Sequence, residues 1–146
     1  MATEARIGWS AEFHLSSDNT VANLVELAEI TSVTLPNPQV EDVEATHFKS
    51  PNRRREYIAG LIEDGEGTFE MNYVPDSATD NAIEDALNAG DARAYKIVVP
   101  DGANGWEISG TCIVKGYERM VPIDDRMTAT PTVRFTGSST EAAGAA

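Results

Sequence analysis

The segment Glu66-Gly67-Thr68-Phe69-Glu70-Met71-Asn72-Tyr73-Val74 decides the fold class of this 146-residue chain. Large apolar side chains alternate in it with polar ones, so that Phe69, Met71 and Tyr73 share one side. A period of two residues indicates a β-strand with one buried and one solvated face. Pro75 ends this strand, because proline cannot donate a hydrogen bond to a neighbouring strand.

The same alternation recurs along the chain and predicts a mainly β protein. Strands of this kind are expected over Arg6–Leu15, Arg93–Val99, Gly105–Tyr117 and Arg126–Thr136. A further strand is expected over about Leu24–Leu35 because of its β-branched residues, with a short helix as the alternative that its leucine spacing also fits. The expected core consists of the apolar sides of the strands: Trp9, Phe13, Leu15, Phe69, Met71, Trp106, Ile108, Cys112, Val114, Val133 and Phe135.

One α-helix is predicted after Pro75. Ser77 followed three residues later by Asp80 is typical of a helix N-terminus. Ala82, Ile83, Ala86 and Leu87 then form an apolar stripe at helical spacing, and Gly90 is the expected C-terminal cap. The combination predicts a β-sandwich or open barrel with one flanking helix.

The length predicts one domain over residues 1–137, with a flexible tail over 138–146. Residues 39–60 form a polar segment that contains the basic cluster Arg53-Arg54-Arg55. A loop of about 20 residues in a compact domain is usually functional or mobile. We therefore expect this segment to be an arm that reaches toward a partner.

The charge balance limits the possible partners. Acidic residues number 24 and basic residues 11, which gives a formal net charge of −13. A net charge this negative argues against tight binding to nucleic acid or to an anionic membrane, because both attract an excess of Lys and Arg side chains. No apolar run is long enough for a transmembrane helix.

Catalytic and metal-binding patterns are absent from the sequence. His14 and His47 are the only histidines, and neither belongs to a recognised catalytic motif. Cys112 alternates with apolar residues and is expected in the core. The segment Asp64–Gly67 lacks the spacing of a calcium loop and is interpreted as an acidic turn. We therefore expect no enzyme activity, no cofactor and no metal site.

Three segments together resemble the tail tube proteins of phages with long, non-contractile tails, and of the related gene transfer agents. The first runs from His47-Phe48-Lys49-Ser50-Pro51 through Arg53, Glu56 and Gly60-Leu61 to Asp64-Gly65-Glu66. The second is Pro100-Asp101-Gly102 followed by Trp106 and Gly110. The third is Val121-Pro122-Ile123-Asp124-Asp125 with Met127-Thr128-Ala129. Their order and spacing cover most of the chain.

This resemblance implies a structural virion protein that forms hexameric rings. The rings would stack into a hollow tail tube with a continuous inner β-barrel, through which DNA passes during ejection. The resemblance also implies assembly in the host cytoplasm, with a tape measure protein and a tail terminator as partners. The arm would grip the neighbouring ring through Val43, His47, Phe48, Arg53, Arg54, Arg55 and Tyr57.

The channel lining follows from charge. A cationic channel would hold DNA tightly, whereas acidic and hydroxyl side chains would let it slide. The polar faces of two predicted strands supply such side chains, so the residues expected to face the lumen are Glu66, Thr68, Glu70, Glu107, Ser109 and Thr111.

Two other functions remain open from the sequence. One is another ring-forming tail component, such as a terminator or completion protein, which only the length of the filament would distinguish. The other is a small β-sandwich binding module, which would present exposed aromatic side chains on a flat face.

Overall fold

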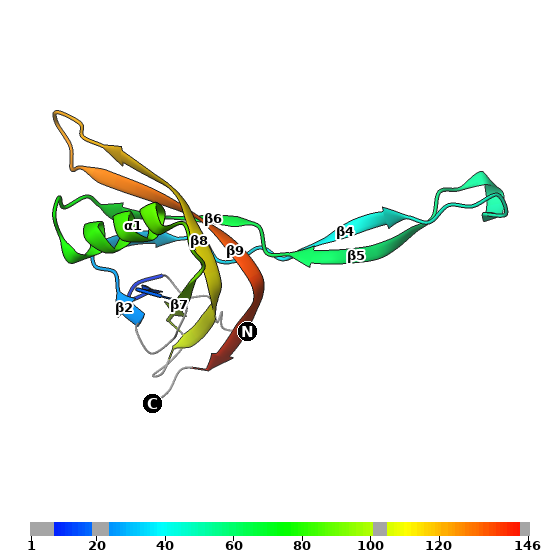
Figure 1. Cartoon of the computed structure of the whole chain (residues 1–146), viewed down its shortest axis with the longest axis horizontal. Coiled ribbons are helices and arrows are strands. Elements are labelled where there is room, and N and C mark those ends of the chain that lie inside the picture. The colour runs from blue at the N-terminus through cyan, green and yellow to red at the C-terminus, as the bar shows by residue number, and fades with distance from the viewer. Residues whose placement is uncertain (1–7, 19–23, 101–104, 144–146) are drawn as a thin grey trace, which may run out of the picture.

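The computed structural model describes residues 8–18, 24–100 and 105–143, and it confirms the mainly β fold class (Figure 1). A short 3-10 turn, η2, covers Pro51–Arg53, and one α-helix, α1, covers Ala78–Ala89 in the part of the chain described. The strands are β1 (Glu12–Ser16), β2 (Leu24–Glu26), β3 (Ile30–Val33), β4 (Gln39–Glu44), β5 (Tyr57–Glu63), β6 (Glu66–Asn72), β7 (Arg93–Val99), β8 (Trp106–Met120) and β9 (Thr128–Ala143).

Seven strands form one antiparallel sheet in the order β2-β1-β7-β8-β9-β6-β3. The sheet curls on itself, as the contact between two distant strands shows. Phe13 of β1 stacks on Phe69 of β6 with ring centroids 4.4 Å apart. Three strands separate β1 from β6 in the sheet. The expected open barrel is therefore present, with its core inside the curl.

The core contains most of the apolar residues that the alternation predicts. Tyr95 stacks on Phe13 and contacts Phe135, which joins β7 and β9 to the aromatic centre. The side chains buried in this core include Phe13, Leu15, Leu27, Phe69, Met71, Ile83, Tyr95, Ile97, Ile108, Cys112, Val114, Ala129, Val133 and Phe135. Burial raises the pKa of the Cys112 thiol to about 12, so the thiol stays protonated and unreactive near neutral pH.

Helix α1 forms as the sequence predicts. Ser77 caps it by accepting a hydrogen bond from the Asp80 backbone N–H at 3.1 Å, and Gly90 ends it in the left-handed conformation. Asp80 turns back to accept a hydrogen bond from the Tyr117 hydroxyl at 2.7 Å. This contact fixes the helix against β8 while Ile83 and Ala86 enter the core.

The N-terminal strand is shorter than predicted, and Trp9 is not in the core. Ser10 has φ of 76°, which turns the chain, and β1 begins only at Glu12. The Trp9 side chain consequently lies 80% exposed. The predicted beginning of this strand, residues 6 and 7, lies outside the described residues.

The segment Leu24–Leu35 forms neither one strand nor a helix. It divides into β2 and β3, which lie at opposite edges of the sheet. Glu29, with φ of 65°, breaks the extended conformation between them. Leu27 anchors this crossing in the core, and the Ala28 N–H donates to the Thr79 hydroxyl of α1 at 2.9 Å.

The sequence predicted a flexible tail from residue 138, but the chain belongs to the sheet up to Ala143. Strand β9 continues past residue 137 and pairs with β8 up to the partners Trp106 and Ala143. Gly137, with φ of 73°, lies where the register between the two strands shifts. It therefore marks an irregularity within the strand, where the sequence predicted an end. Trp106 begins β8 and is 37% exposed, so its expected place in the core is also wrong.

Candidate functional surfaces

The residues predicted to face the lumen lie on the side of the sheet that points away from the core. On β6, the Phe69 and Met71 side chains are buried, whereas Glu66 and Thr68 are exposed and Glu70 is half-buried. On β8, Ile108 and Cys112 are buried, whereas the intervening Glu107, Ser109 and Thr111 are half-buried. The structure thus places all six residues on the polar face of one sheet, in two groups separated by β9.

Strand β9 fills the polar face between these groups with hydroxyl side chains. Thr132 is directly opposite Thr68, and Thr136 is directly opposite Thr111. The side chains of paired residues in antiparallel strands lie on the same face. A row of hydroxyl side chains therefore runs along the polar face from β6 across β9 to β8.

Each of the three acidic residues that were predicted to face the lumen contacts a basic one. Glu107 lies 3.5 Å from the Lys96 ammonium group. Glu66 contacts Lys115 and also lies 3.5 Å from Arg134, and Glu70 lies 3.9 Å from Arg126. The predicted lumen residues are thus hydroxyls and carboxylates whose charges are paired.

The predicted arm is a two-stranded hairpin and not an irregular loop. Strands β4 and β5 pair from Gln39 and Glu63 at the base to Glu44 and Tyr57 near the tip. Figure 1 shows this hairpin projecting away from the seven-stranded sheet. All the residues predicted for the arm lie on it, and all are exposed: Val43, His47, Phe48, Arg53, Arg54, Arg55 and Tyr57.

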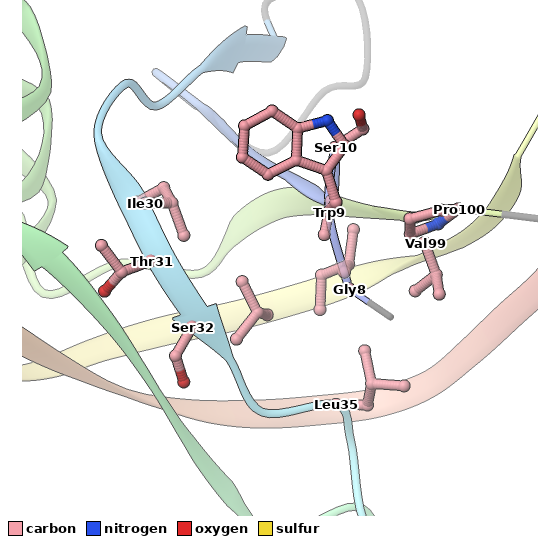
Figure 2. Close-up of a pocket in the computed structure, with 12 residues that line it drawn as sticks. Gly8, Trp9, Ser10, Ile30, Thr31, Ser32, Leu35, Val99 and Pro100 are labelled. Carbon is pink, nitrogen blue, oxygen red and sulfur yellow. The ribbon is translucent and has the colours of Figure 1, made fainter. Parts of the chain in front are cut away.

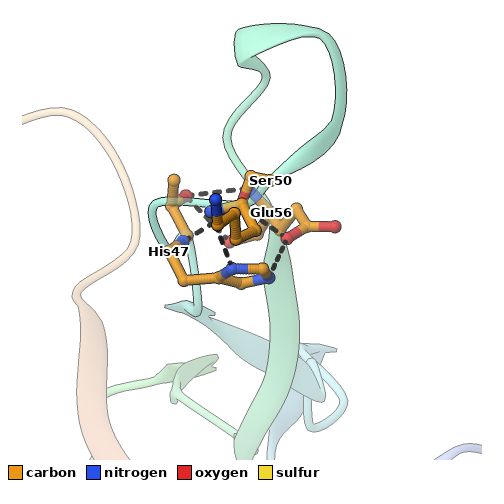
Figure 3. Close-up of polar contacts among 5 residues, drawn as sticks. His47, Ser50 and Glu56 are labelled. Carbon is orange, nitrogen blue, oxygen red and sulfur yellow. Dashed lines mark hydrogen bonds and ion pairs between the residues drawn. The ribbon is translucent and has the colours of Figure 1, made fainter.

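The tip of the hairpin is held by a network of polar contacts (Figure 3). The Ser50 hydroxyl donates to the Glu56 carboxylate at 2.7 Å and accepts from the His47 backbone N–H at 2.9 Å. The Glu56 backbone N–H donates to the Thr46 hydroxyl at 2.9 Å. The tip is therefore ordered by its own side chains although it lies in solvent.

His47 uses both ring nitrogens within this network. Its Nδ1 accepts a hydrogen bond from the Lys49 backbone N–H at 3.1 Å, so this nitrogen carries no proton. Its Nε2 lies 3.3 Å from the Glu56 carboxylate and is the nitrogen that donates. His47, Ser50 and Glu56 all belong to the sequence segment that resembles tail tube proteins. Their contacts give the physical reason for their spacing in that segment.

The basic cluster at the tip is only partly compensated within the chain. Arg55 lies 3.4 Å from Glu44 on the opposite strand. Within the described ranges, no ion pair involves Lys49, Arg53 or Arg54. Asn52 and Arg53 both have positive φ, which presents the cluster on a sharp turn.

A groove of 810 Å³ opens where the curl of the sheet does not close (Figure 2). It lies between the segment that precedes β1, strand β3 and the end of β7. Its lining includes the apolar side chains of Trp9, Leu35 and Val99. Sequence reasoning missed this groove because it depends on how far the sheet curls.

The residues that could suggest catalysis or metal binding have ordinary structural roles. His14 lies on the polar face, 3.2 Å from the Glu12 carboxylate. Asp64 and Gly65 form the turn between β5 and β6, where the Asp64 carbonyl accepts from the Asn37 N–H. No group of potential metal ligands occurs among the described residues, and no helix in those ranges is long and apolar enough to cross a membrane.

Solved structures define the class of fold. The chain is similar to the subunit in the tail of an empty GTA particle, determined with helical C6 symmetry (TM-score 0.75, 15% identity, 95% of this chain and 100% of the other). It is also similar to a subunit of the SPP1 tail tube (TM-score 0.68, 14% identity, 97% and 80%). A chain of the anti-feeding prophage baseplate shares the fold as well (TM-score 0.76, 11% identity, 98% of each).

A family model then identifies the chain. The model described as lambda phage tail tube protein matches residues 9–142. The chain belongs to this family and is a structural component of a virion tail, with no enzymatic role. No sequence among the curated proteins matches it.

Proposed function

We propose that six copies of this chain close into a ring, and that the rings stack into the tube through which DNA leaves the virion. The main support for this proposal is the exposed apolar surface of the β4–β5 hairpin. A two-stranded hairpin is marginally stable alone in water. This one nevertheless exposes seven large apolar side chains: Val40, Val43, Phe48, Tyr57, Ile58, Leu61 and Ile62. Contact with other copies would bury them.

Family membership and fold support self-assembly as the source of this contact. The similar GTA tail has C6 symmetry, which is why a ring of six is the form proposed here. A head-to-tail contact between identical chains either closes into a ring or propagates as a filament. A stacked tube would use both kinds of contact, with a tape measure protein and a terminator as further partners.

The polar sheet face supports its proposed role as the channel wall. Phosphate affinity comes from cations that are free to replace counterions. Lys96, Lys115 and Arg134 on this face each contact a carboxylate. A wall of hydroxyls and paired charges would let DNA slide without binding.

A terminator is the second candidate function. The chain is also similar to the sheath/tube terminator of an extracellular contractile injection system (TM-score 0.70, 10% identity). A tube protein would form filaments of indefinite length by itself, whereas a terminator would stop at one or two rings. Electron microscopy of the purified chain at high concentration distinguishes them.

The base of the hairpin offers a clean experiment. Gln39 and Glu63 are direct partners, so Val40–Ile62 can be replaced by Asn-Gly, which favours a tight hairpin turn. We expect this variant to keep the thermal unfolding transition of the seven-stranded sheet and to form no tubes. Tubes of normal appearance from this variant would contradict the proposal.

A further inference from the structure

The turn between β8 and β9, residues 121–127, is an exposed apolar feature outside the arm. Val121 is 70% exposed and the Ile123 side chain lies wholly in solvent. Pro122 between them is exposed as well, and the acidic pair Asp124-Asp125 follows. Three consecutive apolar residues therefore project into water at this turn, and the chain itself does not cover them.

The groove beside Trp9 is an apolar surface of the opposite shape. Among the described residues that line it, none carries a charge. Its lining passes from buried Ile97 through half-buried Val33 and Val99 to exposed Trp9 and Leu35. Its volume of 810 Å³ falls in the range of pockets that enclose a ligand, so it has room for the side chains of a short turn.

The turn and the groove lie at opposite ends of β8. At the beginning of this strand, Trp106 pairs with Val99, which lines the groove. At its end, Met120 leads directly into the turn. The 15 residues of β8 rise about 3.3 Å each, so the strand covers about 50 Å along its path. Figure 1 shows the two ends of β8 far apart. A chain therefore cannot place its own turn in its own groove.

We infer that the β8–β9 turn of one copy inserts Val121 and Ile123 into the groove beside Trp9 of a second copy. Each chain carries the projecting apolar turn at one end and the apolar groove at the other, which is the arrangement of a head-to-tail contact. Asp124 and Asp125 stay in water beside the groove, because its lining offers no cation to pair with them. The inference rests on the proposed self-assembly and adds a contact that does not involve the arm.

A polar turn tests the contact. Val121→Ser with Ile123→Ser changes two side chains that are exposed in the single chain, so the melting temperature should stay that of the natural chain. We expect the subunit concentration needed for tube formation to rise about tenfold or more, because the contact no longer buries two large apolar side chains. Tubes at the concentration that the natural chain requires would overturn the inference.

The matched control exchanges the two apolar residues. Val121→Ile with Ile123→Val keeps the apolar volume of the turn and should form tubes as the natural chain does. A loss of assembly in this control equal to that of the serine variant would show that the effect does not come from apolar burial, and would overturn the inference.

Photo-crosslinking identifies the occupant of the groove directly. A photoreactive phenylalanine analogue replaces Trp9, and trypsin, which cleaves after Arg119 and Arg126, releases the turn as the peptide 120–126. We expect mass spectrometry to find the probe joined to this peptide, and the separation of turn and groove means that such a crosslink joins two chains. Crosslinks only to residues 1–7, or only to other peptides, would overturn the inference.

The same probe at Val25 is the control for position. Val25 is 53% exposed on β2 and does not line the groove, so it should give no crosslink to the peptide 120–126. Equal yields of this crosslink from the two positions would show random collision and overturn the inference.

Failure of the inference is separable from failure of the proposed function. Tubes of the natural chain that lack the crosslink from the groove to the peptide 120–126 would overturn the inference alone. If the natural chain forms no tubes, the proposed function fails, and the crosslink is then sought in the complexes that the concentrated chain forms. Its absence there would overturn the inference too.

Discussion

At the scale of single residues, Glu56 organises the tip of the arm. Its carboxylate contacts the Ser50 hydroxyl and the His47 ring. Glu56→Ala removes both contacts, which in a solvated site cost about 0.5–1 kcal/mol each. We expect faster amide hydrogen exchange at Lys49 and Ser50, a higher concentration for assembly, and an unchanged melting temperature of the sheet.

Glu44→Ala is the control for this variant. Glu44 lies on the same hairpin and has Arg55, at 3.4 Å, as its partner within the described ranges. Its removal should leave hydrogen exchange at the tip close to that of the natural chain. Equal exchange in the Glu44 and Glu56 variants would show that the network does not order the tip.

Cys112 reports opening of the core. Its pKa, raised by burial to about 12, exceeds the ordinary value of 9.0, so folding favours the protonated thiol. The corresponding stability is present below pH 9 and is lost as pH rises toward 12. We expect iodoacetamide to alkylate the folded chain at pH 8 at least about a hundredfold more slowly than the chain in urea. Similar rates by mass spectrometry would contradict this burial.

At the scale of elements, the last part of β9 is a test of the sheet. A chain that stops after Gly137 loses the pairing of Thr140, Glu141, Ala142 and Ala143 with β8. We expect a loss of about 1–3 kcal/mol in the free energy of unfolding, seen as a melting temperature several degrees lower. A chain that stops after Ala143 is the control. Identical melting of the two would mean that residues 138–143 contribute nothing.

The elements also differ in how far the sequence could predict them. Helix α1 was predictable because its cap at Ser77, its apolar stripe and Gly90 are all local signals. The break between β2 and β3 was not predictable from the sequence. It depends on the tertiary arrangement, in which the two strands lie at opposite edges of the sheet. Gly137 indicates a bend equally well inside a strand or at its end, and only the pairing with β8 distinguishes the two.

At the scale of the whole molecule, the tip cations should govern contact between copies. Arg53→Glu with Arg54→Glu would change the net charge from −13 to −17 and place acids against acidic neighbours. We expect tubes to form only at higher salt, where the repulsion is screened. Light scattering across a salt series measures this change. An unchanged salt dependence would show that the cluster contacts only solvent.

The polar sheet face makes a separate prediction about the assembled tube. Glu66→Gln removes the carboxylate that Lys115 contacts, whereas Arg134 keeps its contact with Glu63. We expect tubes of this variant to bind DNA more tightly at low salt and with a steeper salt dependence, because the freed Lys115 releases a counterion on binding phosphate. Glu41→Gln on the arm changes the net charge equally and is the control. Equal DNA binding by the two variants would show that this face does not line the channel.

The sequence by itself determined the β fold, the helix, the position of the arm and the two sides of strands β6 and β8. These follow from spacings of two and of three to four residues, and from a motif whose His47, Ser50 and Glu56 contact one another locally. Only the tertiary structure decided the ion pairs of the polar face, the unclosed groove beside Trp9 and the pairing of β4 with β5. These features depend on the curl of the sheet and on strand register, which bring together residues that no local spacing relates.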